Sequence, residues 1–192
     1  MQSKPSINKS ALRSDLLQQL NQTSLSVRQS WSLSLQKNLG ELLAGSSGHW
    51  GAYQALSNEP QLEWSKVSSQ IKWCYPEIQG TKLQFHHQPV AFQKSKWGVQ
   101  GPVGGEIIPT NELQGVIVPG LGFTKKGFRL GRGQGYYDRA LSTFKRKKIA
   151  VCFELSLIEE MLSEPHDVLF NHIVTESSIY QVDVSEGDLK WN

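Results

Sequence analysis

The sequence predicts a single α/β domain, covering residues 1–192, whose largely parallel sheet is flanked by helices on both faces. The first observation is that strand-like runs alternate with helical patterns, and this β-α-β order favours a parallel sheet. The second is length, because a chain of 192 residues can form one compact core. The third is continuity, since the sequence contains no repeat, no low-complexity block and no proline-rich linker.

Two helices are expected at the start of the chain. The i, i+4 spacing of Leu12, Leu16 and Leu20 predicts a helix over residues 8–20. A second helix is predicted over residues 24–43, with Ser24 as its N-cap. Its core-facing residues are spaced four apart and are Val27, Trp31, Leu35, Leu39 and Leu43.

The middle of the chain is expected to alternate between short strands, a turn and a short helix. The predicted elements are a strand over 50–56, a turn over 57–60, a helix over 62–69, and strands over 71–75 and 82–87. Residues 88–109 are rich in glycine and proline, so we expect an irregular segment there, which suits a binding loop.

The last third carries the clearest α/β alternation. The predicted elements are a strand over 115–118, a helix over 136–144, a strand over 149–153, a helix over 155–162 and a strand over 172–175. In such a sheet a ligand binds at the carboxyl ends of the strands. The glycine-rich loop that follows residue 118 begins at such an end.

Composition narrows the function classes. A net charge of +3 is too small for a dedicated nucleic-acid binder, and no apolar run approaches the ~20 residues of a membrane span. The N-terminus lacks the apolar core of a secretory signal. Cys74 and Cys152, each in a predicted strand, are expected to be buried reduced thiols, and the five histidines show no zinc spacing. We therefore expect a cytoplasmic protein, acting as a monomer, with neither nucleic acid nor membrane as a partner.

The segment from Gly115 to Arg139 indicates a nucleotide-triphosphate site. Its glycines can expose backbone N–H groups at close range, and its arginines offer guanidinium groups with two parallel donors. Together these donors suit a phosphate. The aspartate at its end, Asp138, is the kind of carboxylate that holds magnesium. Neither a Walker A loop nor a Rossmann turn is present, because Lys125 occupies the third glycine position of the latter. A basic glycine-rich loop without a ligand is the alternative.

The whole string resembles the signature of the 5-formyltetrahydrofolate cyclo-ligase family. That pattern runs Val-Pro-Gly-x-x-Phe and then Gly-x-Arg-Leu-Gly-Arg-Gly-x-Gly-Tyr-Tyr-Asp, and every fixed residue stands between Val118 and Asp138. The resemblance implies an ATP- and magnesium-dependent enzyme that converts 5-formyltetrahydrofolate to 5,10-methenyltetrahydrofolate, with release of ADP and phosphate. The partners that it implies are ATP and a reduced folate.

The resemblance also assigns roles to individual residues. Lys9-Ser-Ala-Leu-Arg13 matches a basic pair that contacts ATP phosphates in the family, although a solvated basic helix face is the alternative. Glu59 and Trp97 match residues that contact the folate, and Arg132 and Tyr137 are the expected catalytic residues. Tyr137 would also help to place the folate. The expected ATP-binding residues are Lys9, Arg13, Arg129, Gly131, Arg132, Gly133, Gln134, Gly135, Tyr136 and Tyr137.

Two positions depart from the family pattern. The expected metal ligands are Asp138 and Asn171, where the family usually has aspartate in place of Asn171, so metal affinity should fall. Thr124 also replaces an aspartate that is frequent in the family. These departures leave open a catalytically weak paralogue that binds nucleotide or folate. A nucleic-acid module built on the basic residues 145–148 has only its charge in its favour.

Overall fold

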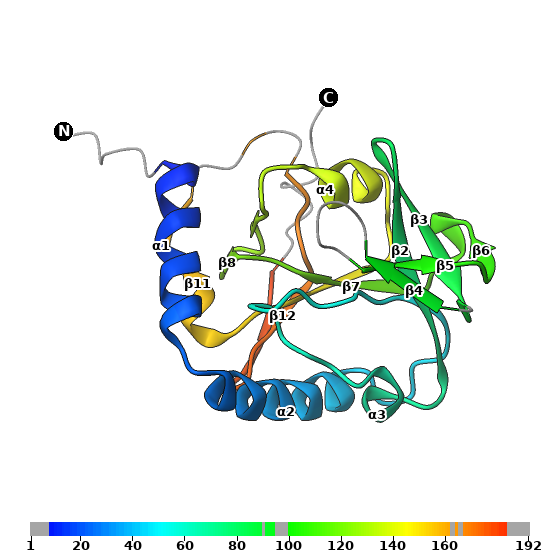
Figure 1. Ribbon diagram of the computed structural model, residues 1–192, viewed down its shortest axis with the longest axis horizontal. Coiled ribbons are helices and arrows are strands. Elements are labelled where there is room, and N and C mark those ends of the chain that lie inside the picture. The colour runs from blue at the N-terminus through cyan, green and yellow to red at the C-terminus, as the bar shows by residue number, and fades with distance from the viewer. Residues whose placement is uncertain (1–7, 90, 95–99, 162–163, 165–166, 184–192) are drawn as a thin grey trace.

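An eight-stranded sheet forms the centre of the computed structural model, which describes residues 8–89, 91–94, 100–161, 164 and 167–183 (Figure 1). Its strand order is β13-β12-β10-β7-β1-β2-β3-β6. Five neighbouring strands pair in parallel, and these are β12 (His172–Val174), β10 (Lys147–Val151), β7 (Gly115–Pro119), β1 (Gly48–Gly51) and β2 (Ile71–Gln79). The antiparallel strands at the edges are β13 (Ile179–Gln181), β3 (Lys82–His87) and β6 (Glu106–Ile108). The predicted largely parallel sheet is confirmed.

Helices cover both faces of this sheet, as the sequence predicts. In Figure 1, α2 (Leu25–Leu42) and α3 (Trp64–Val67) lie below the sheet and α4 (Tyr136–Leu141) lies above it. Leu35 and Leu39 of α2 pack in one buried cluster with Ile117 and Val174. Leu141 of α4 packs in a second cluster on the other side. Within the described ranges, no helix is long and apolar enough to cross a membrane.

The first helix, α1 (Lys9–Gln22), packs beside a second, smaller sheet. This sheet has the order β11-β8-β9 and consists of β11 (Leu157–Ile158), β8 (Gly122–Thr124) and β9 (Arg129–Leu130). Leu16 packs with Leu130 and Ile158, and Leu20 packs with Leu121 and Phe153. The side chain of Asn8 caps the helix by accepting a hydrogen bond from the Ser10 N–H. The helix therefore rests on the glycine-rich segment and not on the main sheet.

The strand order creates a topological switch point between β1 and β7. The chain passes from β1 to β2 on one side of β1, and then returns to β7 on the other side. The segments that follow β1 and β7 leave the sheet in different directions, so a crevice opens between them. That crevice is where a doubly wound sheet binds its ligand.

Several predicted boundaries are wrong, and backbone pairing explains them. The strand predicted over 50–56 ends at Gly51, because only the Ala52 N–H continues the ladder, to the Cys74 carbonyl, before the chain turns away. Residues 155–162, predicted as a helix, form a 3₁₀ turn (Glu154–Ser156) and then β11, which pairs with β8. The segment 88–109, predicted as irregular, contains β4 (Ala91–Lys94), β5 (Gln100–Val103) and β6.

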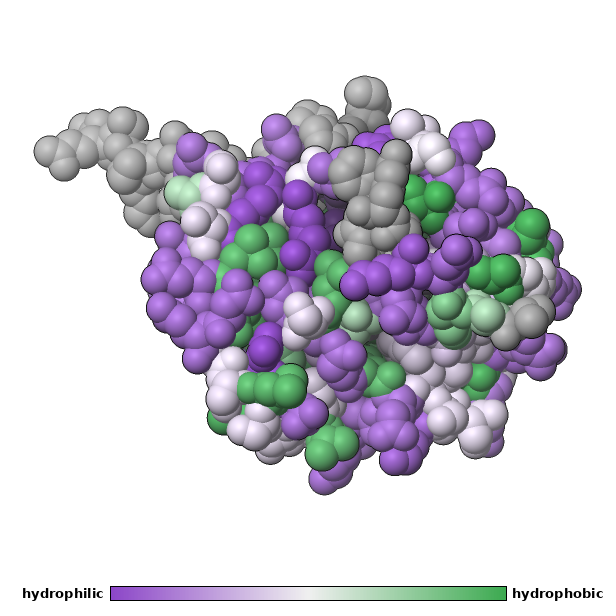
Figure 2. All heavy atoms as spheres, in the orientation of Figure 1, coloured by the Kyte–Doolittle hydropathy of each residue, from purple (hydrophilic) through white to green (hydrophobic). Residues whose placement is uncertain are grey.

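Side-chain burial agrees with the sequence in the core and departs from it at one end of α2. Val27 is 40% exposed. An α-helix has 3.6 residues per turn, so side chains spaced four apart shift gradually around the helix axis, and the first of the predicted core-facing residues no longer faces the sheet. Figure 2 shows green patches at the bottom of the view, over α2, where Leu25 and Leu33 are also exposed. Cys74 and Cys152 are buried free thiols, as predicted, and burial raises the pKa of Cys74 to about 12.

Candidate functional site

A cavity of about 310 Å³ lies at the switch point, between the segments that follow β1 and β7. This volume is at the small end of the range of about 300–1,000 Å³ that is usual for ligand sites. The segment after β1 contributes Tyr53 and Glu59, and the segment after β7 contributes Arg129, Arg132 and Tyr137. The cavity thus collects charged and aromatic side chains from positions that are up to 84 residues apart in the chain, Tyr53 to Tyr137.

Arg129 is a fixed cation in the wall of this cavity. Its Nε donates to the Pro119 carbonyl over 2.9 Å, and its Nη1 lies 3.7 Å from Asp138 Oδ2. Its guanidinium carbon lies 5.1 Å from the centre of the Tyr137 ring. Burial lowers the pKa of Arg129, whereas the Asp138 carboxylate opposes that shift. The side chain therefore carries a positive charge that is already oriented before any ligand arrives.

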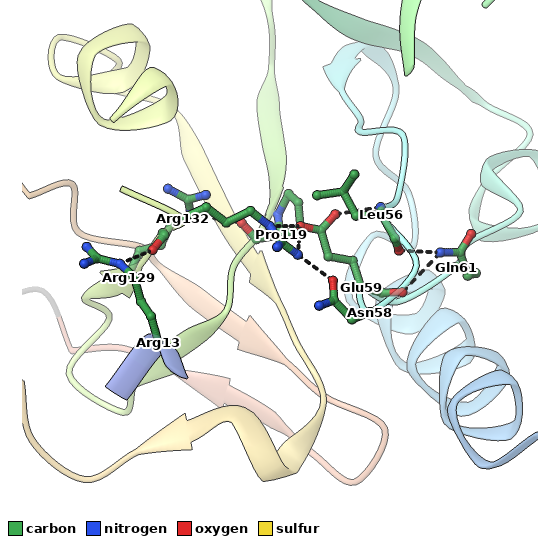
Figure 3. A network of polar contacts seen from close by, with 9 residues as sticks. Arg13, Leu56, Asn58, Glu59, Gln61, Pro119, Arg129 and Arg132 are labelled. Carbon is green, nitrogen blue, oxygen red and sulfur yellow. Dashed lines mark hydrogen bonds and ion pairs between the residues drawn. The ribbon is translucent and has the colours of Figure 1, made fainter. Parts of the chain in front are cut away.

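Arg132 is held by two residues from the segment after β1 (Figure 3). Its Nε and Nη2 each lie 3.3 Å from Glu59 Oε1, and Nη2 also donates to Asn58 Oδ1 over 2.5 Å. Glu59 is only 8% exposed, and its Oε2 accepts a hydrogen bond of 3.0 Å from the Leu56 N–H. The arginine expected at the phosphates and the carboxylate expected at the folate are therefore direct neighbours.

The glycines of the loop have identifiable geometric roles. Gly133 and Gly135 have φ angles of +94° and +63°, which residues with a side chain rarely adopt. A Cβ on Gly131 would lie 2.6 Å from Arg129 Nη1. Gln134 lines the cavity between the two positive-φ glycines, and Tyr136 starts α4 directly after Gly135. The loop therefore needs glycine at these positions to bring its backbone to the cavity.

Of the basic pair of α1, Arg13 contacts this loop and Lys9 contacts a later segment, and neither is among the residues that line the cavity. Arg13 Nε donates to the Gly131 carbonyl over 2.8 Å (Figure 3). Lys9 Nζ lies 2.8 Å from Glu164 Oε2 and 3.1 Å from Asp167 Oδ2. Burial lowers the pKa of Lys9, but the hydrogen bonds to these two carboxylates and the attraction of their charges together outweigh it and leave that pKa raised. The pair is therefore not a bare solvated face, because each member is tied to a distant segment of the chain.

The two tyrosines lie on the cavity wall with different surroundings. Tyr137 packs against the main core, and burial raises the pKa of its hydroxyl, which therefore stays protonated at neutral pH. The Tyr136 ring lies 5.3 Å from the Arg139 guanidinium carbon. Gln100 of β5 closes another part of the cavity. Trp97, which the resemblance assigns to the folate, lies outside the described residues.

The structure does not bring Asn171 to Asp138, so the predicted pair of metal ligands needs correction. Asp138 faces Arg129, which itself bonds to the last residue of β7. Asn171 precedes β12, and its Oδ1 accepts a hydrogen bond of 2.8 Å from the Lys148 N–H near the start of β10. These positions are at opposite ends of parallel strands. Asn171 therefore has a structural role, which is to join the two strands at their amino ends.

Asn58, which contacts Arg132, is a site residue that the sequence did not reveal, as are the cavity-lining residues Tyr53 and Gln100. Asn58 lies in the segment predicted as a simple turn, directly before Glu59. The only available signal was this adjacency, because no periodicity or motif marks the position. Its contact with Arg132 spans 74 positions in the chain and requires the tertiary fold.

Comparison with known proteins agrees with this architecture. The sequence pattern of the 5-formyltetrahydrofolate cyclo-ligase family matches residues 5–176. A mouse protein named 5-formyltetrahydrofolate cyclo-ligase is 27% identical over 193 residues, which cover 88% of this chain and 94% of that protein.

Two solved structures share the fold. The NMR structure of a 5,10-methenyltetrahydrofolate synthetase from Aquifex aeolicus superposes with a TM-score of 0.77 and 24% identity, covering 93% of this chain and 94% of that one. A 5,10-methenyltetrahydrofolate synthetase from Mycoplasma pneumoniae superposes with a TM-score of 0.75 and 23% identity, covering 88% of this chain and 99% of that one.

Proposed function

Because the chain belongs to the 5-formyltetrahydrofolate cyclo-ligase family, we propose that it converts 5-formyltetrahydrofolate and ATP into 5,10-methenyltetrahydrofolate, ADP and phosphate. The observation that carries this proposal is the cavity at the switch point. There, the half-buried Arg129 guanidinium from the glycine-rich segment and the buried Glu59 carboxylate from the segment after β1 line one site. The first suits phosphate, and the second suits the N–H groups of a pterin.

The chemistry requires activation of a poor leaving group. The formyl oxygen attacks the γ-phosphorus of ATP and ADP departs, which leaves a phosphorylated iminium carbon. Nitrogen-10 of the folate then attacks that carbon and loses its proton, and phosphate leaves with the former formyl oxygen. Such a reaction needs positioning and charge stabilisation more than covalent catalysis. Arg129 and Arg132 would supply the positive charge, and Arg13 would hold the loop through the Gly131 carbonyl, while Lys9 stays a predicted phosphate contact.

Glu59 and Tyr137 would place the folate. The Glu59 carboxylate is fixed by the Leu56 N–H, so its direction is set before the substrate arrives. A carboxylate of this kind can accept hydrogen bonds from the amino and ring N–H groups of a pterin. The Tyr137 hydroxyl, which is protonated at neutral pH and whose pKa burial raises further, can donate one.

Magnesium fits this site with one protein ligand. Mg²⁺ that accompanies a nucleotide takes one or two carboxylates, with phosphate oxygens and water completing its shell. Asp138 lies next to Arg129, which lines the cavity, and could supply such an oxygen. Bound there, the ion would neutralise charge on the phosphates of ATP. Within the described residues no group of three His, Cys, Asp or Glu side chains could hold a metal, which agrees with binding through the nucleotide.

The direct test follows the absorbance of methenyltetrahydrofolate in purified protein supplied with 5-formyltetrahydrofolate, ATP and magnesium. The expected result is product formation that needs all three components. Parallel reactions that each omit one component serve as controls. Product in the absence of ATP, or no product in the complete mixture from folded protein, would contradict the proposal.

The magnesium assignment is tested by two substitutions that exchange a carboxylate and an amide. Asp138→Asn should raise the magnesium concentration needed for half-maximal turnover by about tenfold or more, because it removes the negative charge that attracts the ion. Asn171→Asp should leave that concentration unchanged, because its side chain faces the Lys148 backbone. Turnover measured against magnesium gives both midpoints. A shift for Asn171→Asp with none for Asp138→Asn would reverse our assignment.

The alternative of a catalytically weak paralogue loses its main support. It depended on Asn171 as a defective metal ligand, and the structure gives that residue a backbone partner instead. A monomeric, cytoplasmic protein stays a prediction of the sequence.

A further inference from the structure

We propose that Asn58 is a positioning residue which, together with Glu59, holds Arg132 away from the nucleotide until the folate engages Glu59. The inference rests on the proposed function and adds to it a coupling between the two substrates. Arg132 would bind an ATP phosphate through its Nε–Nη2 edge only after leaving the position that the structure shows. The folate would therefore prepare the phosphate site before the reaction begins.

The first step of the argument is which donors of Arg132 are engaged. A guanidinium binds phosphate best with two parallel N–H donors. The edge formed by Nε and Nη2 is directed at Glu59 Oε1, and Nη2 also contacts Asn58. A phosphate that needs this edge must therefore displace both neighbours.

The second step concerns how firmly Glu59 holds the arginine. Glu59 is buried and its other oxygen is bound to the Leu56 N–H, so Oε1 is the oxygen that neutralises Arg132. Hydrogen bonds from a pterin would share that carboxylate and weaken its attraction for Arg132. Asn58, a neutral acceptor, could not then retain the arginine against a charged phosphate. Binding of the folate thus favours release of Arg132.

The third step is thermodynamic. If the folate raises nucleotide affinity, then the nucleotide must raise folate affinity by the same factor. Couplings between sites are typically about 5- to 150-fold, and we expect a value of about tenfold here. This reciprocity separates a true coupling from a kinetic effect on one substrate.

The experiment uses titration calorimetry to measure the affinity of the protein for AMP-PNP, a non-hydrolysable ATP analogue, in the presence of magnesium. The titration is done with and without 5-formyltetrahydrofolate. In the wild-type protein, the folate should tighten AMP-PNP binding by about tenfold. Asn58→Ala should tighten binding several-fold without folate, because it loosens the hold on Arg132. Asn58→Asp should weaken binding with and without folate, because a carboxylate holds Arg132 more strongly. The two variants of one position thus shift affinity in opposite directions.

Gln61→Ala is the matched control for disturbance of the same segment. The Gln61 side chain donates to the carbonyls of Leu56 and Glu59 but does not contact Arg132 (Figure 3). Gln61→Ala should lower thermal stability and leave the affinity for AMP-PNP unchanged.

The inference is overturned if the wild-type protein binds AMP-PNP equally with and without folate, or if both Asn58 variants shift affinity in the same direction. Product formation by the wild-type protein without coupling would refute the inference and leave the proposed function intact. Failure to form product would remove both.

Discussion

Replacement of Arg132 by alanine is expected to lower kcat/KM for ATP by about ten- to a hundredfold. The estimate comes from the ~1.5–3 kcal/mol that a hydrogen bond to a charged group contributes, since 1.4 kcal/mol corresponds to a factor of ten. The same change also leaves Glu59, which is 8% exposed, without its cationic neighbour. Steady-state turnover at varied ATP, at saturating folate and magnesium, gives the value.

Arg132→Lys is the control that separates charge from geometry. A lysine keeps one positive charge but cannot offer two parallel N–H donors, so it should recover only part of the loss. Thermal unfolding of both variants establishes that they are folded. Wild-type kinetics in a folded Arg132→Ala protein would show that this residue does not contact the reacting phosphates.

Replacement of Gly115 by alanine is expected to lower the unfolding midpoint by about 2–12 °C. A Cβ at this first residue of β7 would lie 2.7 Å from Cε3 and from Cη2 of Trp50, and closer still to Cζ3. Trp50 is buried in the core beside β7, so its ring has little room to move. Overpacking of this kind costs about 1–3 kcal/mol, and each kcal/mol shifts the midpoint by about 2–4 °C in a chain of this size.

Gly101→Ala provides a matched strand glycine with room for a methyl group. Its nearest contact would be Glu77 Cγ at 3.9 Å, an ordinary van der Waals distance. Thermal unfolding followed by circular dichroism should therefore show that the free energy of unfolding of this variant differs from the wild-type value by no more than about 0.5 kcal/mol. If Gly115→Ala melts like Gly101→Ala, the packing of Trp50 is looser than the structure shows.

Periodicity was sufficient to predict the parallel core, since its strands are short apolar runs and helices separate β1 from β2 and β7 from β10. It failed where pairing is set by distant segments. Leu157 and Ile158 continue a pattern that is compatible with a helix, yet they pair with β8, more than thirty positions earlier. Ile179–Gln181 was missed because a three-residue edge strand carries almost no signal of its own.

The glycine-rich segment could be assigned to phosphate from its residue types, whereas the contacts within the site could not. The hydrogen bond from Arg13 to Gly131 and the one from Arg132 to Asn58 each join residues that no local pattern relates. The error at Asn171 has the same origin. A match to a family motif gives the position in the sequence, but only the strand register shows that its side chain faces β10.

The docking of α1 onto the glycine-rich segment has a consequence for how the chain folds as it is synthesised. Arg13 and its acceptor, the Gly131 carbonyl, are 118 positions apart, and Leu16 and Leu20 also pack against distant residues. At about 5–20 residues per second, the ribosome needs roughly ten seconds to produce those partners after α1 emerges. During that interval the helix has exposed leucines and nothing native to cover them. We therefore expect α1 to dock only after Ile158 has been synthesised, and to be a segment of the nascent chain that chaperones contact early.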